Sequence, residues 1–189
     1  MRIAVAGSHS TGKSTLIAAF LAKRPSYLYE PEAFEFLADE VELTESEGPT
    51  PEGLELLLEH SVAAVGRYRH GDSVIFERSP MDYLAYAAAS RRSWPSGSIE
   101  GFLSKHITLV QAALSDLDLV VFLPVVSNGI QLREGENRGF RRRVDASLRS
   151  ALVDDEYDVL GGSGSPRVVE LPGNPLRQLS RLLELETGT

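Results

Sequence analysis

The chain of 189 residues carries a formal net charge of −8 at pH 7, with 42% hydrophobic residues, 24% charged residues and no cysteine. This composition is typical of one globular domain with its own core; it excludes a disulfide framework and a thiolate metal site, and the acidic balance argues against general nucleic-acid binding. No apolar run approaches the ~20 residues of a membrane-spanning helix, so we expect a cytoplasmic protein with no membrane partner.

The first predicted element is a buried strand over Arg2–Ala6, a short run rich in apolar and β-branched residues. The loop that follows is Gly7-Ser8-His9-Ser10-Thr11-Gly12-Lys13-Ser14, which fits the P-loop pattern of Gly, four free positions and Gly-Lys-Ser/Thr. Apolar residues at helical spacing then predict a helix from about Ser14 to Lys23. Strand, glycine loop and helix are the context that this motif requires, so we expect a nucleoside triphosphate site.

The chemistry of such a loop follows from its backbone. Gly7 and Gly12 permit positive φ angles and a close approach to a ligand, and the loop N–H groups join the helix N-terminus in a cradle for phosphate oxygens. Lys13 is expected to reach the β- and γ-phosphates, and the Ser14 hydroxyl to ligate Mg²⁺. The predicted ATP-binding residues are Gly7, His9, Ser10, Thr11, Gly12, Lys13, Ser14 and Thr15.

A second short strand is predicted over Tyr27–Tyr29, and Glu30-Pro31-Glu32 follows it. Ligands of open parallel sheets bind outside the carboxyl ends of the strands, so Glu30 is placed to face a second substrate. From residue 25 to residue 66 there is no Lys or Arg, while acidic residues recur. This region suits an acceptor that presents hydroxyl groups or positive charge, and the competing interpretation is a solvated acidic turn.

Between the second and third strands the pattern predicts a helix over Phe34–Val41, an acidic loop over 42–51, and a helix that opens at Pro51 with Thr50 as its N-cap. The apolar stripe of that last helix is interpreted as core. The third strand, Val74–Phe76, delivers Glu77-Arg78-Ser79 at its carboxyl end.

Two of these residues at the end of the third strand are candidates for the site. Glu77 is predicted to hold Mg²⁺ through water, as the second carboxylate does in P-loop enzymes. Arg78 is predicted to clamp a substrate or a phosphoryl group. The alternative is a structural ion pair at a strand end.

The middle of the chain is predicted to hold an Ala-rich helix over Met81–Ala89 and a helix over Leu103–Leu114. Between them, 91–101 breaks the pattern with Trp94-Pro95 and several Ser and Gly residues, and is expected to be a surface loop that acts as a cover. Leu119–Pro124 is the fourth and most apolar strand.

After this strand, six arginines lie between Arg133 and Arg149. Gly135 and Gly139 flank Arg138, and from Phe140 onward the pattern is helical. We predict a hinged lid over about 130–145 that closes over phosphates, with Arg138 and Arg142 as catalytic residues on a shared face. Arg141 is adjacent, and pairing with Asp145 is an alternative for it. The competing interpretation of the cluster is a solvated basic face.

The chain closes with a flexible linker over 161–166, a fifth strand over Arg167–Leu171 and a helix that begins at Pro175 after an Asn174 cap. Five short strands alternating with helices predict an α/β fold. We expect residues 1–189 to form a single P-loop NTPase domain, with a five-stranded parallel sheet, helices on both faces and an arginine-rich lid.

The ordered set of the P-loop, Glu30-Pro31, Glu77-Arg78-Ser79-Pro80 and the late arginines resembles the small P-loop kinases of the nucleoside and nucleotide kinase group. It is similar above all to the AAA-like ATP-binding domains related to nicotinamide riboside kinases and deoxynucleoside kinases, and the resemblance spans nearly the whole chain. It implies that Glu30, or alternatively Glu32, accepts the proton of a substrate hydroxyl. It also implies metal support by Glu77, an active-site role for Arg78, and lid roles for some of Arg138, Arg141 and Arg142.

The chain also departs from the deoxynucleoside kinases. Phe34 and Phe36 stand near the place where those enzymes have a tryptophan, and the stretch from Pro51 to Arg69 holds no glutamine to read a base. Because an Asn-Lys-x-Asp motif is absent, ATP is favoured over GTP. We expect an ATP- and Mg²⁺-dependent kinase that acts on a hydroxyl or phosphate of a small, nucleoside- or nucleotide-like acceptor, in a chain able to form a homodimer. The alternative is an ATP-binding regulatory or partner-interaction module with slow ATP hydrolysis.

Overall fold

The central strand of the fold is β1 (Arg2–Ala6), whose side chains are all buried. The computed structural model describes residues 1–41, 43–44, 48–91, 94–125 and 137–188. On one side β1 pairs with β5 (Val74–Glu77), and on the other with β6 (Leu119–Phe122). The edge strands are β2 (Leu28–Glu30) and β7 (Arg167–Glu170), so the order is β2-β5-β1-β6-β7 and every pair is parallel. The predicted five-stranded parallel sheet is confirmed.

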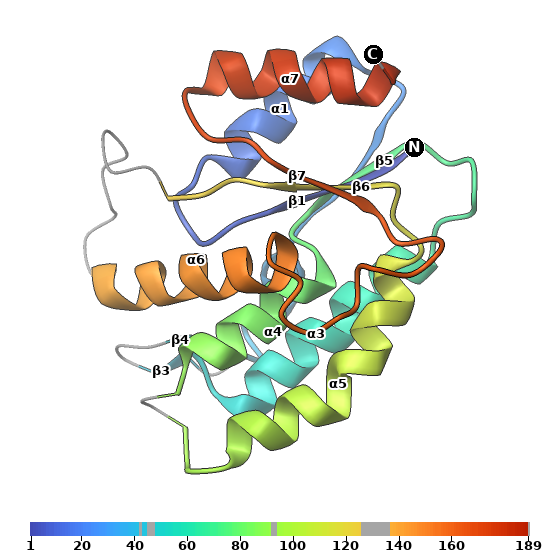
Figure 1. The fold of residues 1–189 in the computed structure, drawn as a ribbon. Helices are drawn as coiled ribbons and strands as arrows, with labels where there is room; N and C mark the ends of the chain where they lie inside the picture. Colours follow the sequence, from blue (N-terminus) through green and yellow to red (C-terminus); the bar gives the residue numbers. More distant parts are fainter. Residues whose placement is uncertain (42, 45–47, 92–93, 126–136, 189) are drawn as a thin grey trace.

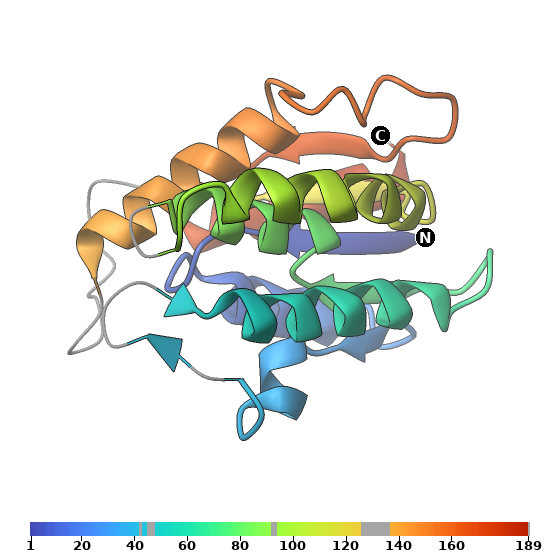
Figure 2. The same cartoon turned by 90° about the horizontal axis from the view of Figure 1, so that it is seen from below.

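Helices cover both faces of this sheet, as Figure 1 shows. One face carries α1 (Lys13–Lys23) and α7 (Pro175–Thr187). The other face carries α3 (Pro51–Gly66), α4 (Pro80–Ala89), α5 (Ser98–Leu114) and α6 (Arg138–Leu152). Figure 2 shows this second layer from below, with α3 near β2 and α6 toward β7. Among the described residues, no helix is long and apolar enough to cross a membrane.

The two layers enclose two separate cores, because successive side chains of a strand point to opposite faces. Ile3 and Val5 of β1 pack with α1 and α7, whereas Ala4 and Ala6 pack with α3 to α6. Small alanines on the second face leave room for α4, which is the most deeply buried of the described helices. This placement of α4 brings its N-terminus next to the glycine loop.

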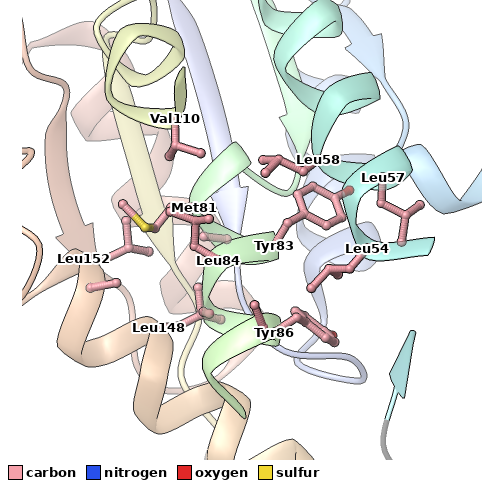
Figure 3. Packing of buried hydrophobic residues seen from close by; sticks show 14 of the residues in the cluster. Leu54, Leu57, Leu58, Met81, Tyr83, Leu84, Tyr86, Val110, Leu148 and Leu152 are labelled. Carbon is pink, nitrogen blue, oxygen red and sulfur yellow. The ribbon is translucent and has the colours of Figure 1, made fainter. Parts of the chain in front are cut away.

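Figure 3 shows how α4 fills the space between its neighbours. Its Tyr83 points toward Leu54, Leu57 and Leu58 of α3, while Met81 lies toward Leu152 of α6. The apolar stripe predicted for α3 is therefore core, as expected.

The acidic region after β2 is more structured than the sequence suggests. The predicted helix over Phe34–Val41 is shorter in the structure, where α2 spans Ala33–Leu37. Instead of a plain loop, β3 (Leu43–Thr44) and β4 (Gly48–Pro49) form a small antiparallel pair. Residues 42 and 45–47 lie outside the described part.

The stretch predicted as a covering loop over 91–101 is only partly a loop. Helix α5 begins at Ser98, five residues earlier than predicted, and Trp94 is buried. The indole N–H of Trp94 donates to the Pro49 carbonyl at 3.4 Å, and its ring packs edge-on against Phe102. Because these contacts lie far apart in sequence, propensity gave no signal for them; residues 92–93 lie outside the described part.

Candidate active site

The glycine loop joins β1 to α1 and requires glycine at its first position. A Cβ at Gly7 would lie 2.9 Å from the Leu123 carbonyl oxygen and 2.8 Å from Thr11 Oγ1, closer than side chains approach. Gly12, just before α1, has φ of +93° in the left-handed region. The hydroxyl of the buried Thr11 donates to the Ser8 carbonyl at 3.0 Å, which ties the loop to itself. His9 and Ser10 are half-buried, and Ser14 and Thr15 are exposed on the first turn of α1.

Lys13 is buried within the loop, and its Nζ donates to the Ser8 carbonyl at 2.9 Å. Burial and, next in size, the nearby positive charge of Arg78 lower the pKa of Lys13 to about 7. The carboxylates of Asp82, Glu32 and Glu77 act in the opposite direction. The ammonium group therefore lies among charged residues from three other parts of the chain. Phosphate oxygens of a bound nucleotide could replace the Ser8 carbonyl as its hydrogen-bond acceptor.

Ser14 and Glu77, the two residues predicted to hold Mg²⁺, lie in contact. The Ser14 hydroxyl donates to Glu77 Oε1 at 2.8 Å, although the two residues are 63 positions apart. Glu77 ends β5 and is buried, and its other oxygen, Oε2, accepts from the Tyr29 hydroxyl at 2.8 Å. Mg²⁺ prefers oxygen ligands, keeps several waters, and is bound through one or two protein groups plus substrate phosphates. A hydroxyl and a carboxylate beside a phosphate-binding loop fit that requirement.

Arg78 connects the end of β5 to the glycine loop. Its φ of +74° places a non-glycine residue in the left-handed region, where strain is most often found at functional sites. Its Nη1 donates to the Gly7 carbonyl at 2.9 Å, its Nε pairs with Glu32, and its guanidinium lies 5.1 Å from the Tyr86 ring centroid. The strand-end ion pair that stood as the alternative is present, with Glu32 as the partner of Arg78, and it lies directly against the P-loop.

Of the two glutamates at and just beyond the end of β2, Glu32 is the one that contacts Arg78. Burial by itself would raise the pKa of Glu32, but the charges of Arg78 and Lys13 hold it below its usual value. The Glu30 carboxylate instead accepts from Arg67 and from the Tyr68 hydroxyl, beyond the end of α3. Glu30 lies opposite Phe76 in the sheet, and Tyr68 packs on Phe76. The Glu30 side chain therefore lies on the face of the sheet that α3 covers.

Asp82 also belongs to this site, although its position in the sequence predicts only the start of a helix. It is fully buried, its Oδ1 accepts from the Gly7 N–H at 3.0 Å, and its Oδ2 accepts from the backbone and side chain of Ser79. It also lies 3.6 Å from Arg78 Nη1. The available signal was Ser79-Pro80-Met81-Asp82, a capping-box spacing that marks a helix start, but the tertiary contact with the P-loop had no sequence signature.

The arginines of α6 divide into different roles. Arg141 is buried, and its guanidinium donates to the carbonyls of His9 at 3.0 Å and Ser10 at 2.9 Å, so it binds the P-loop rather than Asp145. Arg138 and Arg142 are exposed on the first two turns of the same helix. Residues 126–136, which include much of the predicted lid and Arg133, lie outside the described part.

The fold and this loop together define the class of protein. A family model described as an AAA domain matches residues 2–165, and the chain belongs to that family. In structure the chain is similar to deoxyadenosine kinase from M. mycoides with bound dATP, at a TM-score of 0.71 and 12% identity, over 99% of this chain and 100% of that one. It is similar also to thymidylate kinase from Candida albicans, at a TM-score of 0.62 and 18% identity, over 98% of this chain and 91% of that one.

These likenesses identify the fold as that of the P-loop nucleoside and nucleotide kinases. No curated protein matches the chain in sequence.

Proposed function

We propose that this protein is an ATP- and Mg²⁺-dependent kinase that transfers a phosphoryl group to a small acceptor of the nucleoside or nucleotide type. The observation that carries the proposal is the Glu32–Arg78 pair, which is held against the Gly7 carbonyl beside Lys13. A module that only binds nucleotide needs the loop, but it has no use for a carboxylate and a guanidinium fixed next to the phosphate cradle.

In this proposal each residue of the site has a separate role in phosphoryl transfer. The loop N–H groups and Lys13 bind the β- and γ-phosphates, while Ser14 and Glu77 hold Mg²⁺, which neutralises charge on the phosphates. The acceptor oxygen forms a bond to the γ-phosphorus as the bond to the β–γ bridging oxygen breaks, which leaves ADP. Arg78 is placed to orient the acceptor, and Arg138 and Arg142 are the candidates to neutralise the transferring group.

For a hydroxyl acceptor, the proton that leaves the attacking oxygen goes to a carboxylate. We assign this role to Glu32 rather than Glu30, because Glu32 is charged at neutral pH and lies beside Arg78 and Lys13, whereas the Glu30 oxygens are engaged by Arg67 and Tyr68. A phosphate acceptor has no such proton to lose at neutral pH. The effect of Glu32→Gln therefore separates the two kinds of acceptor.

The direct test is ADP release from ATP·Mg²⁺ in the presence of a panel of nucleosides, nucleoside monophosphates and nicotinamide riboside. The blank is Lys13→Ala, which removes the phosphate-binding ammonium. We expect one acceptor class to raise ADP release well above the level without acceptor, with a phosphorylated product of matching amount. A slow background that no acceptor raises and that Lys13→Ala removes would overturn the kinase proposal in favour of a regulatory ATP-binding module.

A further inference from the structure

Tyr29 is a residue of the edge strand β2 that the proposed reaction does not use. In the sheet Tyr29 lies opposite Ile75, whose side chain faces α1. Ile75 is two residues before Glu77, the last residue of β5. A diagonal neighbour in a sheet is within reach of a long aromatic side chain. The Tyr29 hydroxyl accordingly reaches Glu77 and donates to its Oε2 at 2.8 Å.

The two hydrogen bonds to Glu77 act on different oxygens. Oε1 accepts from Ser14 and Oε2 accepts from Tyr29, so the orientation of this buried carboxylate is fixed from both sides. Burial and the hydrogen bond to Glu77 both raise the pKa of Tyr29, so its hydroxyl remains a donor at every physiological pH. Since the Ser14 proton points to Oε1, the lone pairs of Ser14 Oγ are left for a cation.

We propose that Tyr29 is a positioning residue for the Mg²⁺ site, acting through Glu77 on Ser14. With Oε2 held by Tyr29, Oε1 stays in place to accept the Ser14 proton, and the serine oxygen keeps its lone pairs toward the phosphate side of the loop. Partners that orient metal-binding groups typically change metal affinity by about 10- to 100-fold when removed. The inference rests on the proposed function only in taking Ser14 and Glu77 as the place where nucleotide-bound Mg²⁺ is held.

The test uses Tyr29→Phe, which removes the hydroxyl and keeps the ring in the strand. Isothermal titration measures the Kd of ADP in EDTA and again across a range of Mg²⁺ concentrations. We expect the Kd in EDTA to stay within about twofold of wild type, and the Mg²⁺ concentration that gives half of the tightening to rise about tenfold. The matched control is Tyr27→Phe, because the Tyr27 hydroxyl donates to Glu186 at 3.3 Å, away from the loop.

A second measurement separates positioning through Glu77 from a general effect on the fold. In a Glu77→Gln background, adding Tyr29→Phe should change the Mg²⁺ dependence little further, because the two substitutions interrupt one chain of contacts. An unchanged Mg²⁺ dependence in Tyr29→Phe, a shift that Tyr27→Phe reproduces, or full additivity with Glu77→Gln would each overturn the inference.

These titrations involve no acceptor, so their outcome is independent of whether phosphoryl transfer is found. If the acceptor panel gives no product and Tyr29→Phe still shifts the Mg²⁺ dependence, the kinase proposal fails and the positioning role stands. If wild type binds ADP equally well with and without Mg²⁺, the positioning role fails whatever the panel gives.

Discussion

At the scale of single residues, the pKa of Lys13 is strongly lowered by its surroundings. Its pKa of about 7 means that the free protein loses the ammonium charge as the pH rises through neutrality. Phosphate oxygens placed beside Nζ favour the charged form and raise the pKa in the bound state. The contribution of this charge to nucleotide binding is therefore fully present below about pH 7 and is lost as the pH rises toward the bound-state pKa.

This difference predicts a pH dependence of ADP binding. Between about pH 7 and about pH 9, the Kd of MgADP should rise by up to about tenfold per pH unit, with uptake of close to one proton on binding. Titration calorimetry in two buffers of different ionisation enthalpy measures both quantities. A Kd that does not change over this range, with no proton uptake, would show that Lys13 remains charged in the free protein.

Glu30 at the end of β2 and Glu32 just beyond it should respond differently to loss of charge. Glu32→Gln is expected to lower kcat for a hydroxyl acceptor by about 10²- to 10⁴-fold, because a general base typically contributes that much, while ADP binding survives. Glu30→Gln should retain most of the transfer rate and lower stability by on the order of 1 kcal/mol, since it weakens bonds from Arg67 and Tyr68. Steady-state rates and thermal melts of both variants measure this contrast.

If transfer disappeared in Glu30→Gln and survived in Glu32→Gln, the assignment of the base would revert to Glu30. The present assignment rests on the different partners of the two side chains, since Arg67 and Tyr68 engage Glu30 and Arg78 engages Glu32. Glu30, in β2, lies on the α3 face of the sheet, whereas Glu32, beyond the end of the strand, reaches Arg78 at the loop.

A pair of glycines provides a further test at this scale. Gly7→Ala is expected to cost about 1–3 kcal/mol through overpacking and to abolish ADP binding, because the new methyl group would meet the Leu123 carbonyl and Thr11. Gly101→Ala is the matched control, since it lies in α5 with no atom within 4 Å of the new Cβ, and should stabilise by about 0.5–1 kcal/mol. Denaturant unfolding measures the change in the free energy of unfolding for both variants. If Gly7→Ala left this free energy unchanged, the packing argument would be contradicted.

At the scale of elements, helix α6 is attached to the P-loop by one side chain. Both bonds of the Arg141 guanidinium go to loop carbonyls. The C=O and N–H of a trans peptide point in opposite directions, so bonds that fix the His9 and Ser10 carbonyls also fix the orientation of the two peptide N–H groups that follow them. The helix after the fourth sheet strand thus supports the loop as well as carrying Arg138 and Arg142.

Loss of this attachment should weaken nucleotide binding even without an acceptor. Because a hydrogen bond from a charged group contributes about 1.5–3 kcal/mol, we expect Arg141→Met to raise the Kd of MgADP by about 10- to 100-fold. Arg177→Met, which removes an exposed arginine of α7, controls for the loss of one positive charge. An unchanged Kd in Arg141→Met would mean that the loop holds its shape without α6.

At the scale of the whole molecule, the sheet separates two cores, and each core packs against the same strands. Trp94, the single tryptophan, lies in the core on the α3 to α6 side. Leu182 of α7 is fully buried in the core on the opposite face. If the two layers unfold as one unit, fluorescence of Trp94 reports damage done on the far side of the sheet.

We therefore predict that Leu182→Ala destabilises the protein by about 2–5 kcal/mol, and that the Trp94 fluorescence transition shifts together with the far-UV circular dichroism transition. Leu176→Ala, at an exposed position at the start of the same helix, is the control and should change stability little. Two separated transitions in Leu182→Ala would show that the α1 and α7 layer unfolds independently of the rest.

Features that depend on local pattern can be derived from the order of the amino acids alone. Apolar runs of strand length, amphipathic helices, capping residues and the P-loop spacing each follow from neighbours along the chain, and they predicted the parallel α/β fold and the position of Lys13 and Ser14. The same information placed Glu77 and Arg78 at a strand end, where ligands of parallel sheets bind.

Which of these residues contact one another is set by the packing of the fold. The bond from Ser14 to Glu77, the choice of Glu32 over Glu30 as the partner of Arg78, and the attachments of Asp82 and Arg141 to the loop all join residues distant in sequence. Such contacts depend on the strand order and on which face of a strand or helix a side chain occupies. A shift of one residue along a strand moves a side chain to the other face, so residue type and spacing alone do not determine them.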